Sequence, residues 1–264
     1  MSTFLFNEIV FGPVYSRRLG ISLGINLLPT DYKYCNFDCI YCECGRNSHL
    51  HRRGAGERGK KFPAQQDVYT ALENKLTIMQ QAGQLPDAIT FAGNGEPTIH
   101  PAFAGIIDDT FTLRNRYAPQ SKISVLTNAT MLHRQEVTDA LKKTDMPILK
   151  LDSAFDATIE LLNQPAKKIT ASLLIGQLQS FGKQCIVQTM FVQGTYHRQI
   201  VDNTTPAELE AWERAILDIR PAQVMIYTIA RDTPTETLCK ISGEKLRQIA
   251  AMIEKHGIAV QVSE

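Results

Sequence analysis

Strand-like and helix-like segments alternate along this chain, and that alternation constrains its fold more than any other feature. Apolar runs, several of them near-continuous, predict strands at residues 20–28, 88–92, 123–126, 147–151, 185–191, 223–227 and 258–262. Helical periodicity lies between these runs, at residues 64–81, 101–117, 133–143, 154–162, 169–181, 206–219 and 242–256. Because near-continuous apolar strands belong to sheets covered by helices, the pattern predicts a parallel α/β fold.

About six such units predict a partial (β/α)6 TIM-like barrel with parallel strands, although a doubly wound open sheet would show the same alternation. We predict a single domain over residues 1–264, because this length fits one α/β barrel. Its core is expected at about residues 18–230, followed by the C-terminal helix and short strand within residues 242–262. With 44% hydrophobic and 21% charged residues, the chain can bury a core of that size.

Polar and small residues follow the predicted strands at their carboxyl ends, where α/β folds bind their ligands. In chain order these segments are the cysteine cluster at residues 35–44, then residues 93–98, 127–130, 152–153, 193–196 and 228–233. The carboxyl ends of parallel strands share one rim of a barrel, so we expect these segments to lie together and to form the functional site.

The cysteine cluster has the spacing C-x3-C-x2-C at Cys35, Cys39 and Cys42. Three thiolates on a short loop can hold three irons of a four-iron cluster and leave the fourth iron open to another ligand. With Cys44, the same residues could instead form a four-cysteine zinc site, and the spacing alone leaves both readings open. Such a tight group indicates metal binding or catalysis rather than a disulfide framework. The remaining residues, Cys185 and Cys239, are interpreted as small hydrophobic side chains.

A C-x3-C-x-aromatic-C motif after the first strand of an α/β barrel resembles the radical S-adenosylmethionine (SAM) superfamily. The resemblance implies that Cys35, Cys39 and Cys42 ligate a [4Fe–4S] cluster whose free iron is chelated by SAM. It places Tyr41, just before the third cysteine, near the adenine of SAM. Cys44 has no counterpart in the core motif and is interpreted as a neighbour of the cluster, not a ligand.

Three further segments resemble SAM-binding segments of that superfamily. The string Gly93-Asn94-Gly95-Glu96 resembles its Gly-Gly-Glu-like segment, which binds the SAM ammonium group, although Asn94 separates the glycines here. Asn128 lies in a Thr-Asn segment that resembles Thr-Asn-Gly, with alanine replacing the glycine. The positions usually in polar contact with the SAM carboxylate and ribose are Lys150, Asp152 and Ser153. Lys150 and Asp152 share one strand face, because side chains alternate along a strand.

The segment at residues 11–20, together with Cys44 and the glycine after it, resembles an uncharacterised group of iron–sulfur oxidoreductases. That group is related to the enzyme that forms the tricyclic wyosine base of tRNA, and the similarity extends to Arg231. The candidate substrate contacts are Arg17, Arg18, His197 and Arg231. The two adjacent arginines could instead pair with acids on the barrel floor. A basic loop at residues 45–61 could contact phosphate or an RNA backbone, or could simply be solvated.

The resemblance implies a radical SAM enzyme that takes one electron from an external flavodoxin- or ferredoxin-like reductant. It would cleave SAM reductively to methionine and a 5′-deoxyadenosyl radical, which abstracts hydrogen from a substrate. RNA, peptide and small-molecule substrates all remain open, and no catalytic residue is identified. The balance of 28 basic and 27 acidic residues argues against a protein that mainly coats nucleic acid.

Two other classes of function fit the same residues. One is a zinc-stabilised RNA-binding or interaction module without redox chemistry, and the other is an iron–sulfur protein that transfers electrons without cleaving SAM. The sequence lacks a signal-peptide pattern at its start and any apolar stretch of about eighteen residues. It therefore predicts a cytoplasmic protein without a membrane partner.

Overall fold

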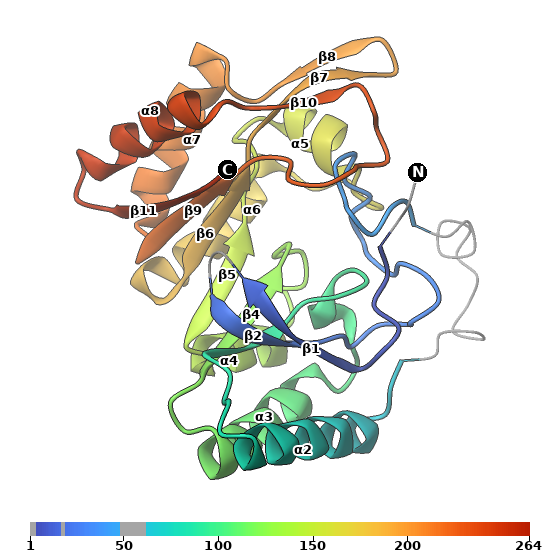
Figure 1. Cartoon of the computed structure of the whole chain (residues 1–264). Coiled ribbons are helices and arrows are strands. Elements are labelled where there is room, and N and C mark those ends of the chain that lie inside the picture. The colour runs from blue at the N-terminus through green and yellow to red at the C-terminus, as the bar shows by residue number, and fades with distance from the viewer. Residues whose placement is uncertain (1–3, 17–18, 48–61) are drawn as a thin grey trace.

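The computed structural model describes residues 4–16, 19–47 and 62–264. Its central element is an eight-stranded sheet with the order β1-β2-β3-β4-β5-β6-β9-β11, curled into a partial barrel (Figure 1). Strand β1 (Val10–Ser16) pairs antiparallel with β2 (Gly20–Ile25), and every following pair of neighbours is parallel. The remaining strands are β3 (Ala88–Phe91), β4 (Lys122–Thr127), β5 (Met146–Lys150), β6 (Ile186–Met190), β9 (Gln223–Tyr227) and β11 (Ala259–Ser263). The parallel α/β partial barrel predicted from the sequence is confirmed.

Helices cover the outer face of the curled sheet (Figure 1). They are α2 (Gln65–Gln81), α3 (Phe103–Tyr117), α4 (Gln135–Lys143), α5 (Asp156–Asn163), α6 (Ala171–Gln179), α7 (Pro206–Ile219) and α8 (Gly243–Glu254). All seven correspond to predicted helices, and most begin one or two residues later than the periodicity indicates, as is common at helix ends. Among the residues that the structure describes, no helix is long and apolar enough to cross a membrane.

Alternation along each strand divides the core into an outer and an inner part. On β6, Val187 packs in the large cluster under the helices, and Thr189 accepts a 3.0 Å hydrogen bond from the indole of Trp212 on α7. Ile186, on the opposite face, packs in a small cluster with Ile148 and Met225 inside the barrel. This inner cluster packs inside the barrel, below the carboxyl ends of the strands where the polar side chains gather.

Three features differ from the sequence-based expectations. Strand β1 was not predicted, and it adds an antiparallel edge to a sheet that was expected to be entirely parallel. Strand β2 ends at Ile25 rather than at residue 28, because the Asn26 side chain accepts a hydrogen bond from Leu28 N (3.2 Å) and turns the chain. A second, three-stranded sheet with the order β10-β7-β8 lies beside α5 and was not predicted. It consists of β7 (Val192–Tyr196), β8 (Gln199–Asp202) and β10 (Leu238–Lys240), and β7 includes residues that the sequence assigned to a rim loop.

Candidate functional site

The cysteine loop lies over the carboxyl ends of the strands, in a pocket of about 290 Å³. Its wall contains all four clustered cysteines and residues at or just after the carboxyl ends of β3, β4, β5, β6 and β9. Of the residues predicted from sequence, those that line it are Cys35, Cys39, Cys42, Tyr41, Gly93, Gly95, Glu96, Asn128 and Lys150. The structure therefore brings together side chains that are far apart in the sequence, as expected for the rim of a parallel barrel.

A short bridge between Tyr34 and Gly95 attaches the cysteine loop to the end of β3. Tyr34 N donates to Asn94 O (2.8 Å), and Glu96 N donates to Tyr34 O (3.2 Å). Gly95 has a φ of +143°, and a Cβ at this position would lie 1.9 Å from Tyr34 O. Only glycine therefore allows this close approach of two backbone segments.

Replacing Gly95 by alanine should lower the unfolding free energy by roughly 2–3 kcal/mol, because strain and a backbone clash add together. Chemical denaturation followed by Trp212 fluorescence would measure the change. Gly83→Ala is the matched control, because Gly83 also has a positive φ (+67°) but open space around its Cβ position. A Gly95→Ala variant no less stable than Gly83→Ala would show that the bridge is not required.

An ion pair inside the cysteine loop was not foreseen from the sequence. The side chain of Lys33 is only 2% exposed, and its Nζ donates to Gly45 O (2.9 Å) and to Asp38 Oδ1 (3.3 Å). Asp38 also accepts from Asn47 N (2.8 Å), and Asn47 Oδ1 accepts from Cys35 N (3.1 Å). These bonds join the start, middle and end of the loop between residues 33 and 47, and backbone bonds attach it to the segment after β3 and to the end of α5.

Burial and nearby charges shift the pKa values of the loop's thiols in different directions. Burial raises the pKa of Cys35 and Cys39, because a buried thiolate loses its hydration. The Cys44 thiol and then the Lys33 ammonium outweigh burial at Cys42 and lower its pKa. Burial alone would lower the pKa of Lys33, but nearby thiolates and Asp38 raise it above the ordinary value for lysine. The ammonium group is therefore a fixed positive charge beside the cysteines.

Glu96 joins the ends of β3 and β4 through its buried carboxylate. Oε1 accepts from Thr98 N (3.1 Å), Thr98 Oγ1 (2.5 Å) and Thr127 Oγ1 (2.7 Å). Oε2 accepts from Asn128 N (2.7 Å), and a carboxylate oxygen can accept more than one hydrogen bond. Burial raises the pKa of Glu96, although these donors oppose the change. Glu96 lines the pocket, so the remaining acceptor position on Oε2 can serve a cationic ligand.

Asn94 faces away from this pocket, unlike the residues on either side of it. Its side chain donates to Phe6 O and Pro29 O and accepts from Phe6 N, each at 2.8 Å. It is fully buried and is absent from the pocket wall. Within Gly93-Asn94-Gly95-Glu96, the asparagine therefore holds the N-terminal segment in place, while its neighbours face the site.

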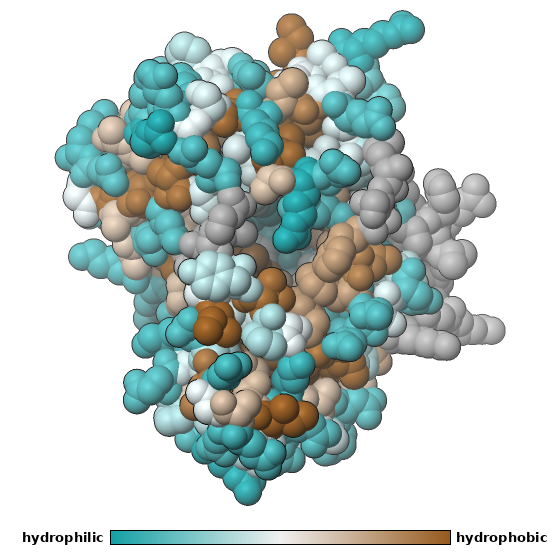
Figure 2. All heavy atoms as spheres, viewed as in Figure 1, coloured by the Kyte–Doolittle hydropathy of each residue, from teal (hydrophilic) through white to brown (hydrophobic). Residues whose placement is uncertain are grey.

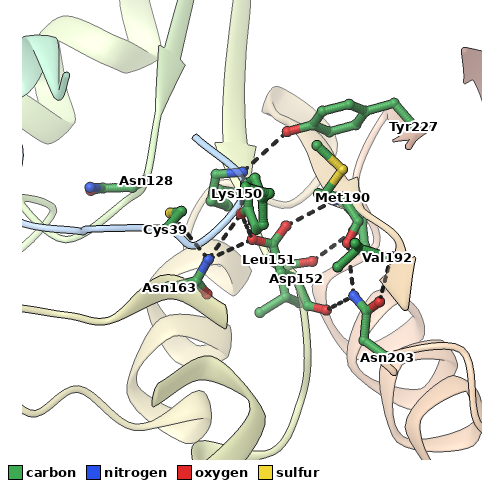
Figure 3. Close-up of polar contacts among 12 residues, drawn as sticks. Cys39, Asn128, Lys150, Leu151, Asp152, Asn163, Met190, Val192, Asn203 and Tyr227 are labelled. Atoms are coloured by element: carbon green, nitrogen blue, oxygen red, sulfur yellow. Dashed lines mark hydrogen bonds and ion pairs between the residues drawn. The ribbon is translucent and has the colours of Figure 1, made fainter. Parts of the chain in front are cut away.

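Lys150 lies in a polar network on the opposite wall (Figure 3). Its Nζ is 3.2 Å from the Tyr41 hydroxyl, 3.3 Å from the Tyr227 hydroxyl and 3.6 Å from Asp152 Oδ2. Asp152 also accepts from Met190 N (2.9 Å), from Asn163 Nδ2 (2.7 Å) and from the Tyr41 hydroxyl. The network fixes the ring of Tyr41 and leaves Lys150 as the cation on this side of the pocket.

Two asparagine amides reach the sulfur atoms. Asn163 Nδ2 is 3.5 Å from Cys39 Sγ, and Asn128 Nδ2 is 3.6 Å from Cys35 Sγ. Asn128 also donates to Asn36 Oδ1 (2.7 Å), which ties it to the cysteine loop. Sequence analysis identified Asn128 but missed Asn163, because nothing in the pattern separates that residue from an ordinary helix end.

Other predicted residues lie outside the wall of this pocket. Asp152 lies behind it in the Lys150 network, and Ser153 donates to Glu208 Oε2 on α7 (2.7 Å). His197 is exposed in the turn between β7 and β8, with its ring 4.1 Å from that of Tyr196. Arg231 pairs with Glu43 (2.8 Å) beside the pocket. Arg17, Arg18 and residues 48–61 of the basic loop lie outside the described residues.

A second cavity, of about 440 Å³, adjoins the first inside the barrel. Both cavities are lined by Leu126 and Gln188, so they meet at these two side chains. Figure 2 shows apolar side chains around a hollow in the middle of this face. The barrel therefore contains the cysteine-lined pocket next to a largely apolar cavity.

Several solved structures share this architecture, and they identify the class of proteins that has this fold. A radical SAM methyltransferase from Sphaerobacter thermophilus aligns with a TM-score of 0.65 and 14% identity over 92% of this chain and 65% of that one. Streptococcus suis SuiB bound to S-adenosylmethionine gives 0.60 and 14% over 91% and 50%, and archaeal TYW1 gives 0.51 and 11% over 89% and 71%. The chain therefore has the partial-barrel fold of radical SAM enzymes.

Sequence comparison finds relatives with higher sequence identity than these solved structures. A UPF0026 protein of Helicobacter pylori is 28% identical over 93% of this chain and 74% of its own length. A protein of Brachyspira hyodysenteriae named GTPase Obg is also 28% identical over 93% of this chain, which spans only 33% of that protein. A UPF0026 protein of Synechocystis is 31% identical over 70% of this chain and 64% of its own length. No protein-family profile matches the chain.

Proposed function

We propose that this chain is a radical SAM enzyme that holds a [4Fe–4S] cluster through Cys35, Cys39 and Cys42. The observation that supports this most is the placement of the three thiols in one pocket with the ends of the neighbouring strands. The fold is shared with solved radical SAM enzymes, one of them described as bound to S-adenosylmethionine. The proposal includes the cluster, SAM, the external electron donor and an unidentified substrate.

The donor set of the pocket fits a cluster with several irons. Among residues 4–16, 19–47 and 62–264, no three Cys, His, Asp or Glu side chains meet at the spacing of a single metal ion. In a four-iron cluster each cysteine binds a different iron, so the thiolates surround the cluster instead of meeting at one point. The amides of Asn163 and Asn128 lie near two of the sulfurs, as hydrogen-bond donors to cluster ligands commonly do.

When bound, the cluster and SAM would supply reductive cleavage of SAM after one electron arrives from a flavodoxin- or ferredoxin-like partner. The chain's own residues orient SAM and exclude water. Glu96 Oε2 would accept from the SAM ammonium group, with the glycine backbone at Gly93 and Gly95 allowing a close approach. Lys150, on the opposite wall, would bind the SAM carboxylate, and the ring of Tyr41 would lie along the nucleoside.

Incubating anaerobically purified, iron-loaded protein with SAM and dithionite should yield 5′-deoxyadenosine and methionine, measured by liquid chromatography and mass spectrometry. A Lys150→Met variant should lower the affinity for SAM by about tenfold, because one charge-assisted contact is lost. Lys183→Met is the control, because Lys183 lies in a short turn before β6 and away from the pocket. An iron-loaded protein that never forms 5′-deoxyadenosine would be an electron-transfer protein, and a colourless zinc protein would support the RNA-binding or interaction module.

A further inference from the structure

The second cavity has an aromatic wall at the open side of the barrel. Phe6 and Phe11 stack with ring centroids 3.6 Å apart and planes at 19°, and Phe4 meets Phe6 edge-on at 4.9 Å. All three rings line the cavity. The ring of Phe11 lies directly over Gly24 of β2, where a Cβ would be 2.1 Å from its Cζ atom. The wall therefore has a defined position inside the barrel and offers flat surfaces for stacking.

The opposite wall of this cavity carries a buried side-chain amide that has no hydrogen-bond partner among the described residues. Gln188 is 6% exposed, lies on β6 between Ile186 and Met190, and lines both cavities. Among the residues that the structure describes, its side-chain amide has no hydrogen-bond partner, and its polar atoms remain accessible from the cavities. Buried polar groups are normally paired, so an unpaired amide aimed into a cavity indicates a ligand that supplies the partner.

The remaining polar groups of this cavity are already engaged. Ser22 and Thr90 bond to each other at 2.8 Å, and Arg231 at the rim pairs with Glu43. The rest of the wall includes Leu126 and Met225, which are apolar. A ligand that fills the cavity must therefore be largely apolar on its faces and polar at one edge, where it meets Gln188.

We infer that this cavity binds a flat heteroaromatic ring that carries a hydrogen-bond donor and an acceptor side by side on one edge. The donor and acceptor would pair with the Gln188 amide, which offers both groups in one plane, while the ring stacks on the phenylalanine wall. A free base and a base at the end of an RNA strand share this chemistry. The inference rests on the proposed function, because it assigns the ring to the substrate that reaches the cysteine-lined pocket.

Equilibrium dialysis of the iron-loaded protein against the 9-methyl derivatives of hypoxanthine and purine, called hypoxanthine and purine below, tests this directly. The two rings have the same size, and with N9 methylated only the hypoxanthine derivative carries an N–H next to a hydrogen-bond acceptor. Wild-type protein should bind hypoxanthine about tenfold more tightly than purine, as expected when paired hydrogen bonds are made in a buried site. Gln188→Leu should remove that difference and leave purine binding unchanged, with iron content and thermal unfolding midpoint as controls for folding.

A third arm uses a short single-stranded oligoribonucleotide containing inosine. Tighter binding of the oligonucleotide than of hypoxanthine would assign the ring to RNA, and the reverse would assign it to a small molecule; both support the site. Equal affinity of wild-type protein for hypoxanthine and purine, or no binding of either, would overturn the inference. That comparison needs no SAM cleavage, so its failure is distinct from failure of the proposed enzyme activity.

Discussion

Replacing Cys39 by alanine should abolish iron loading, because a cluster held by three thiolates cannot assemble on two. Cys39 is buried, lines the pocket and lies 3.5 Å from the amide of Asn163. The wild-type protein should contain about four irons and four sulfides per chain after anaerobic purification, and Cys39→Ala close to none. Iron and acid-labile sulfide analysis, with the visible absorption spectrum, would measure the loss.

Cys44→Ala is the critical comparison for this prediction. Cys44 lines the same pocket, but its Sγ lies 3.4 Å from Gly93 O, and its thiol acts on Cys42 as a hydrogen-bond donor. We expect the variant to keep an assembled cluster. Cys239→Ala is a second control, because that thiol is exposed and does not line the pocket. Loss of iron from Cys44→Ala as complete as that from Cys39→Ala would contradict the assignment of three ligands.

The second large effect is expected at Lys33. Lys33→Met should lower the unfolding free energy by about 3–5 kcal/mol, because it leaves the buried Asp38 carboxylate without its close cation. Arg46 lies 3.9 Å from the other carboxylate oxygen and is a weaker partner. Thermal and chemical unfolding of the variant and the wild type, both prepared in the same cluster-loaded state, would measure the difference.

A double variant distinguishes the charge effect from a packing effect. Lys33→Met with Asp38→Asn leaves no uncompensated charge in the loop, so it should recover part of the stability lost in Lys33→Met. Lys255→Met serves as the surface control, because Lys255 pairs with Glu213 where its side chain is 56% exposed. A double variant less stable than the sum of the two single changes would contradict the ion-pair explanation.

The fold could be predicted from sequence because its main signals are local. Largely apolar strands such as β3 and β6 are buried along their whole length, and turn or cap residues separate them from the helices. The three-stranded sheet could not be predicted in this way. Ile200 on β8 is 82% exposed and β7, with the sequence Val-Gln-Gly-Thr-Tyr, carries polar residues and a glycine, so the segment resembles a polar loop. Strand β10 pairs with β7 across about forty residues of sequence, which local periodicity does not encode.

The site was predictable only where residues share a motif. The spacing of Cys35, Cys39 and Cys42 and the position of Glu96 after a strand indicated that these side chains share a pocket. The side chain of Asn94 could not be oriented, because its direction depends on contacts with Phe6 and Pro29. Gln188 became informative only when its unpaired amide was seen between two cavities, since a glutamine on a strand has no sequence pattern of its own.

Mössbauer spectroscopy of iron-enriched, anaerobically prepared protein tests the central claim most directly. If three cysteines hold the cluster and leave one iron for SAM, then roughly a quarter of the iron signal should change when SAM is added. The same change should be absent with 5′-methylthioadenosine, which lacks the amino and carboxylate groups that would bind the open iron. A spectrum in which all iron sites are equivalent and unaffected by SAM would contradict the assignment.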